Sequence, residues 1–527
     1  MDLVEVRELE GPNLFILEPA VKIEVHSTTL RQTDETAPHP YAASNNVPDD
    51  VLQLAALTRD ALAVAGMPDC PVLTVPMETE GNYSIVFPWT DRRISRLVAR
   101  AMRGVGSGEC ADLGQLQDDA AEIRSNEPGP DDLPVMIEDE RRSALTIAVT
   151  GTNGKTTTTR LLAHIFRCAG QRVGWSSSSG VYINGEEVLS GDYSGPRGAE
   201  RVLTDPDVDV AITETARGGI LLRGVVCQSV DVSVFTNISP DHLALQGVRT
   251  VEGLAWAKGV VTRITRPDGY AVLNANDPLV MGATREIRAQ KFLVSTDPNV
   301  PELLAHGASG LPAMTVIDGN VTLIETGIPT VVLSVSDIPI TSGGAATFMV
   351  ENSLFAAAAA LAAGATLTHV REGLASFQNT PEMNPGRLNI FERDGVKVIV
   401  DFAHNEAGLT ALLAFARSIC TDNGRLIAVV GTAGDRTDAS LIEIGRVATF
   451  DSDYVIAKNT THYLRGRTQE ELMGLYVRGI QSGRNVPYET SENELTAVVR
   501  ALEIARPGDV IAAMTHEHTA EISALFA

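Results

Sequence analysis

Short apolar runs alternate with amphipathic stretches along most of the chain. From about position 144 onward, apolar runs recur, and several segments between them carry apolar side chains at i, i+3 and i+4 spacing. Strands are expected at 145–149, 209–213, 230–236, 270–273 and 292–295, and helices at 156–169 and 251–264. This alternation predicts a mostly parallel sheet with crossover helices.

Other segments show different patterns. Strand-like runs and an amphipathic helix before position 110 indicate a small α+β module, and the acidic, proline- and glycine-rich stretch after it is typical of an exposed connector. Residues 301–344 predict short strands and turns, and the alanine-rich run 354–365 predicts a buried helix. A hairpin pattern at 388–400 opens a second alternating series. We therefore predict domains at 1–110, 111–143 (the connector), 144–384 and 385–527.

Composition and charge narrow the class of protein. The 527 residues carry 42 Lys and Arg against 67 Asp and Glu, so a formal charge of −25 would repel a nucleic-acid backbone, and we expect no nucleic-acid partner. The run 354–365 is shorter than the ~20 residues that cross a bilayer, and no secretory signal is visible. The five cysteines form neither a disulfide ladder nor a Cys-x-x-Cys clip. These features predict a cytoplasmic protein without a membrane partner.

A glycine-rich turn between the strand at 145–149 and the helix at 156–169 carries the strongest chemical signal. Its backbone N–H groups can converge on phosphate oxygens, Lys155 adds a positive charge, and the Thr156 hydroxyl can ligate Mg²⁺. Val149 stands where the general phosphate-loop pattern has glycine, and a chance Gly-Lys-Thr in a surface loop is the alternative. The strand–turn–helix order favours nucleotide binding. The residues expected at the phosphates are Gly151, Thr152, Asn153, Gly154, Lys155, Thr156 and Thr157.

Two polar residues follow neighbouring strands of the predicted sheet. Glu214 comes directly after the strand 209–213, and His242 follows the strand 230–236 after a short loop. The carboxyl ends of parallel strands share one edge, where ligands bind in open α/β sheets. Taken singly, Glu214 would be a solvated strand-end acid and His242 a loop histidine. Their arrival beside a phosphate loop favours roles as oxygen and nitrogen ligands of metal ions.

Lys258 stands in an apolar helical stripe with Leu254 and Val261. It is either a lysine whose ammonium reaches solvent along an extended stem, or a buried lysine that reacts with carbon dioxide to give a metal-binding carbamate.

Other charged residues carry weaker signals. Three arginines near the Glu214 strand could grip a carboxylate or simply face solvent: Arg197, Arg217 and Arg223. His516 and His518 are expected as surface residues opening a helix rather than as metal ligands.

Several motifs, in order along the chain, together resemble those of the Mur ligase superfamily. They are Thr150–Thr157, Glu214-Thr215, Asn237–Leu243, Leu273–Pro278, Pro385–Arg387, Asp401–Asn405 and Gly431–Arg436. Within the superfamily, Leu9–Leu14, Glu214–Leu221 and Asp337–Thr341 resemble the cyanophycin synthetases. Those enzymes carry an ATP-grasp domain between their N-terminal module and their Mur-like half, whereas here the acidic connector leads directly to Leu145.

The resemblance implies an α/β protein with a central ATP-binding domain built on a parallel sheet and a Rossmann-like C-terminal domain. It implies that Lys155 binds the β- and γ-phosphates and that Asn352 contacts adenine. Arg387 and Asp401 would reach the nucleotide as the C-terminal domain closes, and His404 would face the site from the same loop.

The resemblance also implies a metal site. Thr156 and Glu214 would hold a first Mg²⁺, His242 would serve a second metal position, and Lys258 stands where several Mur ligases carry a carbamylated lysine. The expected catalytic residues are Lys155, Glu214, His242, Lys258 and His404.

The implied activity is that of an ATP-dependent amide ligase, which activates a carboxylate as an acyl phosphate and joins it to the amine of an amino acid. In cyanophycin synthetases the Mur-like half joins a basic amino acid, usually arginine, to an aspartate side chain. The alternatives are a simple phosphate-loop NTPase and a non-catalytic nucleotide-binding partner of a separate ATP-grasp ligase. We expect ATP and Mg²⁺ as cofactors, and a homo-oligomer is compatible with the sequence.

Overall fold

The computed structural model describes residues 1–29, 39–44, 46–106, 109–241, 243 and 245–526. The chain divides into two units that are interleaved along the sequence. The first comprises residues 1–151, 170–238 and 244–292, and the second comprises 152–169, 239–243 and 293–527.

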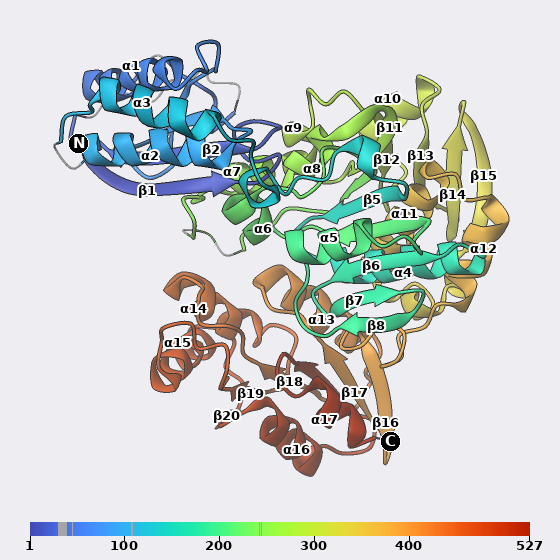
Figure 1. Cartoon of the computed structure of the whole chain (residues 1–527). Helices are drawn as coiled ribbons and strands as arrows, with labels where there is room; N and C mark the ends of the chain where they lie inside the picture. Colours follow the sequence, from blue (N-terminus) through green and yellow to red (C-terminus); the bar gives the residue numbers. More distant parts are fainter. Residues whose placement is uncertain (30–38, 45, 107–108, 242, 244, 527) are drawn as a thin grey trace. The chain divides into compact units, whose positions relative to one another are not determined.

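The N-terminal part of the first unit is a four-stranded antiparallel sheet covered by helices on one face (Figure 1). The strands are β1 (Asp2–Leu9), β2 (Ala20–His26), β3 (Leu73–Pro76) and β4 (Asn82–Pro88), in the order β1-β2-β4-β3. The helices are α1 (Asp49–Val64), α2 (Arg92–Gly106) and α3 (Leu113–Arg124). Apolar side chains of β2, β4 and the three helices form a common core.

Helix α3 corrects the expectation of an exposed connector after residue 110. Leu116 and Ala120, four residues apart, lie on one helical face and are buried in the core with α1 and α2. The acidic residues of α3, such as Asp118, lie on its exposed side. The acidic composition of this segment therefore predicted an exposed connector, although one narrow face of the helix is apolar and packs into the core. The domain boundaries themselves stay predictions.

The rest of the first unit contains the parallel sheet predicted from the alternation of strands and helices. Its strand order is β11-β10-β5-β9-β6-β7-β8, parallel from β11 to β6 and antiparallel from β6 to β8. The strands are β5 (Leu145–Thr150), β6 (Val173–Ser177), β7 (Gly180–Ile183), β8 (Glu186–Leu189), β9 (Val210–Glu214), β10 (Val230–Phe235) and β11 (Thr265–Asn274). The helices are α5 (Pro196–Leu203), α6 (Arg217–Arg223), α7 (Val251–Lys258), α8 (Val260–Arg263) and α9 (Pro278–Ala283). The single helix expected at 251–264 is thus divided at Gly259.

The N-terminal motif contacts the loop after α6. Glu10 N–H donates to the Arg223 carbonyl at 2.7 Å, and Val225 N–H donates to the Pro12 carbonyl at 2.7 Å. A Cβ atom at Gly11 would lie 2.0 Å from the Val225 carbonyl oxygen, so only glycine permits this approach.

The second unit begins in the phosphate loop and contains α4 (Lys155–Cys168), which packs against α11 (Thr347–Ala362) and α12 (Leu367–Ser376). Most of α11 is buried, as its alanine-rich sequence predicted. Strand β12 (Gln290–Val294) crosses from the first unit to the second, and the second continues with α10 (Pro301–Ala308), β13 (Ala313–Ile317), β14 (Asn320–Glu325) and β15 (Ile328–Ser334). Strands β13 to β15 are antiparallel, and α10 is a helix that the sequence reading of 301–344 did not include.

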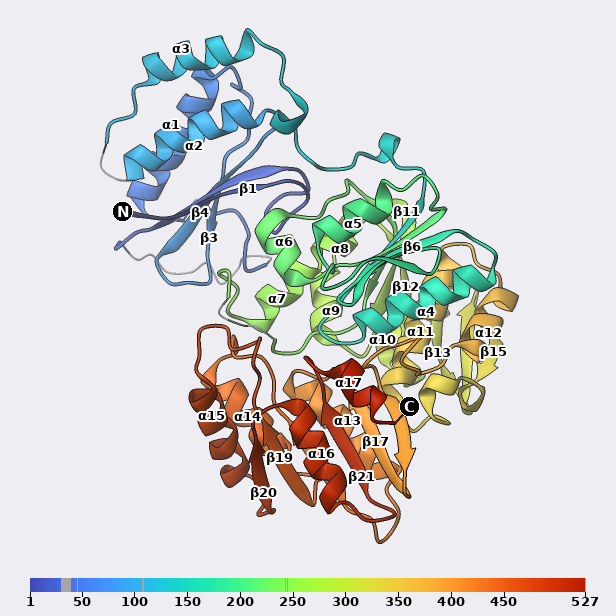
Figure 2. The same ribbon diagram turned by 60° about the horizontal axis from the view of Figure 1, so that its bottom comes forward.

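The C-terminal part of the second unit is a six-stranded sheet in the order β16-β17-β21-β18-β19-β20. Figure 2 labels its strands β17, β19, β20 and β21. The strands are β16 (Asn389–Arg393), β17 (Val396–Asp401), β18 (Leu426–Val430), β19 (Tyr454–Lys458), β20 (Tyr488–Ser491) and β21 (Val510–Met514). The predicted hairpin joins β16 and β17, and the other neighbours are parallel. The helices are α13 (Glu406–Ser418), α14 (Asp438–Val447), α15 (Gln469–Ser482), α16 (Glu494–Ile504) and α17 (Thr519–Ala524). Loops after β17, β18, β19 and β21 therefore gather at one edge.

None of the helices within the described ranges is long and apolar enough to span a bilayer.

Candidate functional site

The phosphate loop starts at the end of β5, where Gly151 has a backbone φ of 143°. A Cβ atom at this position would lie 1.9 Å from Thr236 Oγ1, at the end of the neighbouring strand β10. Thr236 N–H also donates to the Thr150 carbonyl at 3.0 Å. Glycine is therefore required both by the backbone conformation and by the close approach of the next strand.

The second half of the loop forms the N-terminus of α4 in the second unit. Gly154 is the N-cap with φ of 86°, and a Cβ atom there would lie 2.3 Å from Asn352 Oδ1. As a glycine, the N-cap has no side chain of its own over the first turn of α4. Lys155 Nζ folds back to the Thr152 carbonyl at 2.7 Å, so its charge lies over the loop. A helix N-terminus that begins at a glycine, with a lysine beside it, is suited to an anion.

Glu214 and Lys258 lie next to the start of this loop in the first unit. Glu214 ends β9 opposite Val149 of β5, is 3% exposed, and accepts a hydrogen bond from Ser178 N–H at 3.1 Å. Lys258 is also 3% exposed, and its Nζ donates to the Gly151 carbonyl at 2.7 Å. The ammonium of Lys258 is thus buried against the loop rather than directed to solvent.

The predicted metal set of Thr156, Glu214 and His242 stays a prediction. Thr156 and Glu214 belong to different units, and His242 lies outside the described residues. Within the part of the chain that the structure describes, no group of three or more His, Cys, Asp or Glu side chains is arranged to hold a metal ion.

Arg387 reaches the phosphate-loop helix within the second unit. Its Nη2 donates to Thr156 Oγ1 at 3.2 Å, and its guanidinium lies 4.4 Å from the centre of the Phe402 ring. Asp401 accepts hydrogen bonds from Leu388 N–H at 2.8 Å and Ala403 N–H at 2.7 Å. Burial raises the pKa of Asp401, while Arg387 and these two N–H groups oppose the rise. Through the Leu388 N–H bond, Asp401 therefore lies beside the segment that carries Arg387.

A second pair of contacts joins the phosphate loop to the loop after β17. Asn405 Nδ2 donates to Asn153 Oδ1 at 3.0 Å, and Asn153 Nδ2 donates to Asn405 Oδ1 at 3.3 Å. Asn405 is also the N-cap of α13 through Gly408 N–H. The two asparagines exchange amide hydrogen bonds, which fixes the orientation of both side chains.

His404 lies between opposite charges at the same edge. Burial lowers the pKa of His404 to about 3; Asp241 raises it, and the positive charges of Arg436 and Lys155 lower it further. Arg436 Nη1 forms an ion pair with Asp241 Oδ1 at 2.9 Å. His404 is therefore neutral at pH 7, because burial disfavours its protonated form.

The sequence reading missed a buried charge cluster behind this edge. Lys458 and Glu494 are 2% and 1% exposed and form an ion pair at 2.6 Å, and His516 lies 3.1 Å from the same ammonium. His516, expected as a surface residue, is only partly exposed, and both of its ring nitrogens have protein partners. In the sequence, the cluster is indicated only by the place of its members next to predicted elements: Lys458 ends a strand, Glu494 begins a helix and His516 follows a strand.

The three arginines near Glu214 differ in their surroundings. Arg217 is 8% exposed and donates to the Leu245 carbonyl at 3.3 Å and to Gln246 Oε1 at 3.2 Å, so it is not a solvated surface arginine. Arg197 and Arg223 are exposed. A carboxylate-binding role for any of them stays a prediction.

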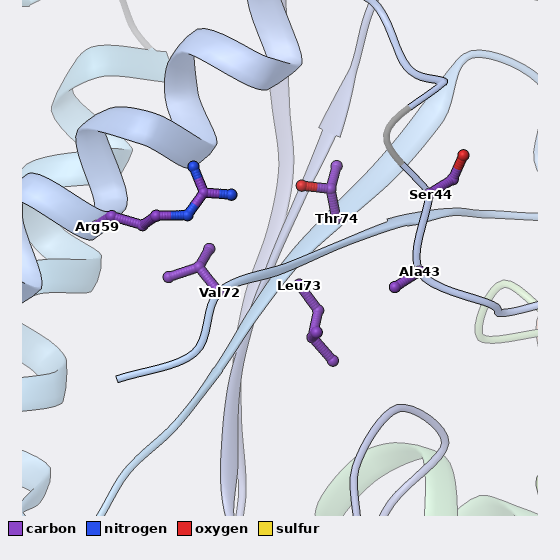
Figure 3. Close-up of a pocket in the computed structure, with 6 residues that line it drawn as sticks. All are labelled: Ala43, Ser44, Arg59, Val72, Leu73 and Thr74. Atoms are coloured by element: carbon purple, nitrogen blue, oxygen red, sulfur yellow. The ribbon is translucent and has the colours of Figure 1, made fainter. Parts of the chain in front are cut away.

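A separate pocket of about 150 Å³ lies in the N-terminal sheet (Figure 3). It is lined by Ala43, Ser44, Arg59, Val72, Leu73 and Thr74, and includes none of the predicted site residues. Ser44 N–H donates to the Thr74 carbonyl at 2.9 Å, so the segment around Ser44 runs along the edge strand β3.

Comparisons with known proteins agree with this architecture. The Mur ligase middle domain matches residues 149–360, and the Mur ligase glutamate ligase domain matches residues 386–515. The chain therefore belongs to the Mur ligase superfamily.

Among individual relatives, cyanophycin synthetase of Synechocystis sp. is 40% identical over 68% of this chain, and that of Crocosphaera subtropica is 36% identical over 72%. The matches span 40% and 43% of the length of those enzymes. A 2,6-diaminopimelate-adding Mur ligase of Chlorobium phaeobacteroides is 28% identical over 71% of this chain and 72% of its own length.

Solved structures show the same fold. The ADP complex of E. coli FolC has a TM-score of 0.54 at 22% identity, covering 73% of this chain and 90% of that one. A folylpolyglutamate synthase/dihydrofolate synthase with Mn, AMPPNP and L-glutamate bound has a TM-score of 0.55 at 21% identity, covering 74% and 91%.

Proposed function

We propose that this chain is an ATP-dependent amide ligase, which activates a carboxylate as an acyl phosphate and joins it to the amine of an amino acid. The observation that carries the proposal is the glycine turn between β5 and α4, with positive φ at Gly151 and Gly154 and with Lys155 folded over the loop at the N-terminus of α4. The names of its relatives among cyanophycin synthetases and Mur ligases support the ligase reaction.

The chain's residues would share the binding of ATP. The loop from Gly151 to Thr157 would cradle the phosphates with its N–H groups, and Lys155 would lie against the β- and γ-phosphates. Asn352, which lies against Gly154, would contact adenine. Arg387 and Asp401 would bind the nucleotide from the β16–β17 region.

The Thr156 hydroxyl and the Glu214 carboxylate, which are hard oxygen donors suited to Mg²⁺, would hold a first ion. His242 would serve a second metal position, and Lys258 would hold a metal there only if its amine is carbamylated. When bound, Mg²⁺ neutralises negative charge on the transferred phosphoryl group.

In the reaction, the substrate carboxylate would attack the γ-phosphate in line, and the charge of Lys155 would stabilise the transferred phosphoryl group. The amine would then displace phosphate from the acyl phosphate.

The substrates are proposed from the resemblance to cyanophycin synthetases. We propose arginine or another basic amino acid as the amine and an aspartate side chain in a small molecule or peptide as the acid. The acidic net charge of −25 favours encounter with a cationic amino acid.

Two other functions predict different behaviour. A phosphate-loop NTPase would hydrolyse ATP without an amine, and a nucleotide-binding partner of a separate ATP-grasp ligase would bind ATP without releasing phosphate. The presence of Lys155, Glu214 and Arg387 in the sequence favours a catalytic protein over a binding partner, because a binding partner has no need of a metal ligand such as Glu214.

The test is a phosphate-release screen of amino acids with Mg²⁺, ATP and aspartate-containing acceptors, with mass spectrometry of the product. We expect release that requires both acid and amine. Lys155→Ala should abolish it and leave the fold intact, whereas the charge-matched Lys291→Ala, on β12, should not. Release that needs no amine would identify an NTPase, and product formation by Lys155→Ala at the wild-type rate would refute the assignment.

A further inference from the structure

The buried charge cluster of Lys458, Glu494 and His516 lies at the same strand edge as the loop after β17. Lys458 is the last residue of β19, Glu494 the first residue of α16, and His516 follows β21. A Cβ atom at Gly431 would lie 3.1 Å from Lys458 Cγ and 2.4 Å from its carbonyl oxygen. Glycine at the end of β18 therefore leaves room for the lysine stem.

Glu494 holds both the lysine and the segment that contains the histidine. Its Oε2 accepts from Lys458 Nζ at 2.6 Å and from His516 N–H at 2.9 Å, and its Oε1 accepts from Glu517 N–H at 2.7 Å and from His518 N–H. Burial raises the pKa of Glu494, but Lys458 and the backbone N–H groups outweigh burial and lower it overall. The Glu494 carboxylate is thus ionised, and both of its oxygens accept hydrogen bonds.

The hydrogen bonds of His516 define one tautomer. Lys458 Nζ can only donate, so Nδ1 of His516 at 3.1 Å accepts, and Nε2 carries the proton. Nε2 then donates to the Ala403 carbonyl at 2.9 Å. Burial, and after it the adjacent charge of Lys458, lower the pKa of His516 well below its ordinary value.

Ala403 belongs to the loop that carries the predicted site residues. Its N–H donates to Asp401, and its carbonyl accepts from His516, so both of its backbone groups are held. The preceding Phe402 contacts the His516 ring edge-on at 4.9 Å and supports the Arg387 guanidinium on its ring.

We propose that His516 is a positioning residue of this ligase. Held by Lys458 and Glu494, its Nε2–H fixes the Ala403 carbonyl, and thereby the loop that presents Phe402, His404 and Asn405 toward Arg387 and the phosphate loop. The proposal rests on the proposed function for its catalytic readout. Ionisable groups are costly to bury, and apolar side chains of similar volume stabilise a core at least as well. The cluster is therefore better explained by orientation of the loop than by stability.

Two substitutions separate the two hydrogen bonds of the ring. His516→Gln places its amide nitrogen near the position of Nε2 and keeps a donor for Ala403. His516→Asn keeps an oxygen near the position of Nδ1 for Lys458 but has no donor that reaches Ala403. Both lose the aromatic contact with Phe402, so they are matched in that respect. A misplaced catalytic group can cost up to about 100-fold in rate.

We expect His516→Asn to lower kcat about 10- to 100-fold, because a misplaced loop costs rate. It should also weaken the binding of Mg²⁺·ADP, measured by calorimetry. For the same reason, His516→Gln should stay within about threefold of wild type in kcat and in ADP affinity. The apparent Tm of the two variants should be similar. In the wild type, ¹⁵N NMR should show His516 neutral with the proton on Nε2.

The proposal is overturned if the two variants have equal kcat and equal ADP affinity, or if both lose activity only in proportion to a loss of folded protein. A wild-type signal with the proton on Nδ1 would also overturn it. If the wild type shows no amine-dependent turnover, the ligase proposal fails, and ADP affinity and the NMR signal still decide the role of His516.

Discussion

Removal of one partner of the Lys458–Glu494 ion pair should destabilise the protein in a way that depends on pH. Lys458→Met preserves the volume of the buried stem but leaves the Glu494 carboxylate, 1% exposed, without its cation. In the variant, the Glu494 carboxylate either stays ionised, with backbone N–H groups as its only partners, or takes up a proton. The state of lower free energy is the one populated, so the free energy of protonation sets the upper limit of the loss in stability.

The limit can be worked from the ordinary pKa of 4.5 for this carboxyl group. At pH 7 the proton costs roughly 3.4 kcal/mol, which is 2.5 pH units at about 1.36 kcal/mol each, and at pH 5 it costs roughly 0.7 kcal/mol. The first value agrees with the ~3–5 kcal/mol typical of breaking a buried pair. Uptake of a proton by His516, which also contacts Lys458 Nζ, would reduce the cost further.

Thermal unfolding of the whole chain at the two pH values measures this difference. At roughly 2–4 °C per kcal/mol, Lys458→Met should lower the apparent Tm by at most about 7–14 °C at pH 7 and by at most about 1–3 °C at pH 5, relative to wild type at the same pH. The double variant Lys458→Met/Glu494→Gln removes the charge that was stranded and should regain part of the loss at pH 7. Equal losses at pH 5 and pH 7, or no recovery in the double variant, would show that the ion pair is not the cause.

Two further predictions concern stability elsewhere in the chain. The pKa of His404, about 3 in the folded protein against 6.5 ordinarily, means that its stabilising contribution is complete above pH 6.5 and is lost as pH falls toward 3. His404→Asn should therefore reduce the fall in unfolding free energy between pH 6.5 and pH 5 by about 2 kcal/mol, measured by urea unfolding, and an unchanged pH dependence would contradict the burial of this ring. Leu116→Ala in α3 should destabilise the N-terminal module by about 2–5 kcal/mol, measured by hydrogen exchange in residues 1–124, whereas the exposed Asp118→Ala should change it little. Equal, small effects of the two changes would restore the interpretation of this segment as a connector.

Local patterns were sufficient where the physical cause is itself local. The turn from Gly151 to Lys155 was predicted because glycine, a preceding apolar run and a following helix are neighbours in sequence. The β16–β17 hairpin was predicted because the Asp394-Gly395 dipeptide between two strand-like runs is typical of a hairpin turn, and in the structure both residues have the positive φ values, 53° and 76°, that such a turn requires. The parallel sheet of the first unit followed from alternation, since parallel strands need crossover segments.

Contacts between distant residues were not visible in these patterns. Lys458 and Glu494 are 36 positions apart, and His516 is 58 positions from Lys458, so no spacing rule connects them. The apolar stripe of α3, which contains Leu116, is too narrow for the sequence pattern to distinguish a packed helix from an exposed one.

The sequence alone predicted the alternation of strands and helices around the phosphate loop, the loop itself and the superfamily, because each depends on residues a few positions apart. Only the tertiary structure decided which charges are buried, which tautomer His516 adopts and which carbonyl it holds. Burial, tautomer and hydrogen-bond partner depend on strand ends that lie far apart in the sequence and come together in the fold. At such a place, the solvent exposure and the partners of a side chain are set by its neighbours in space.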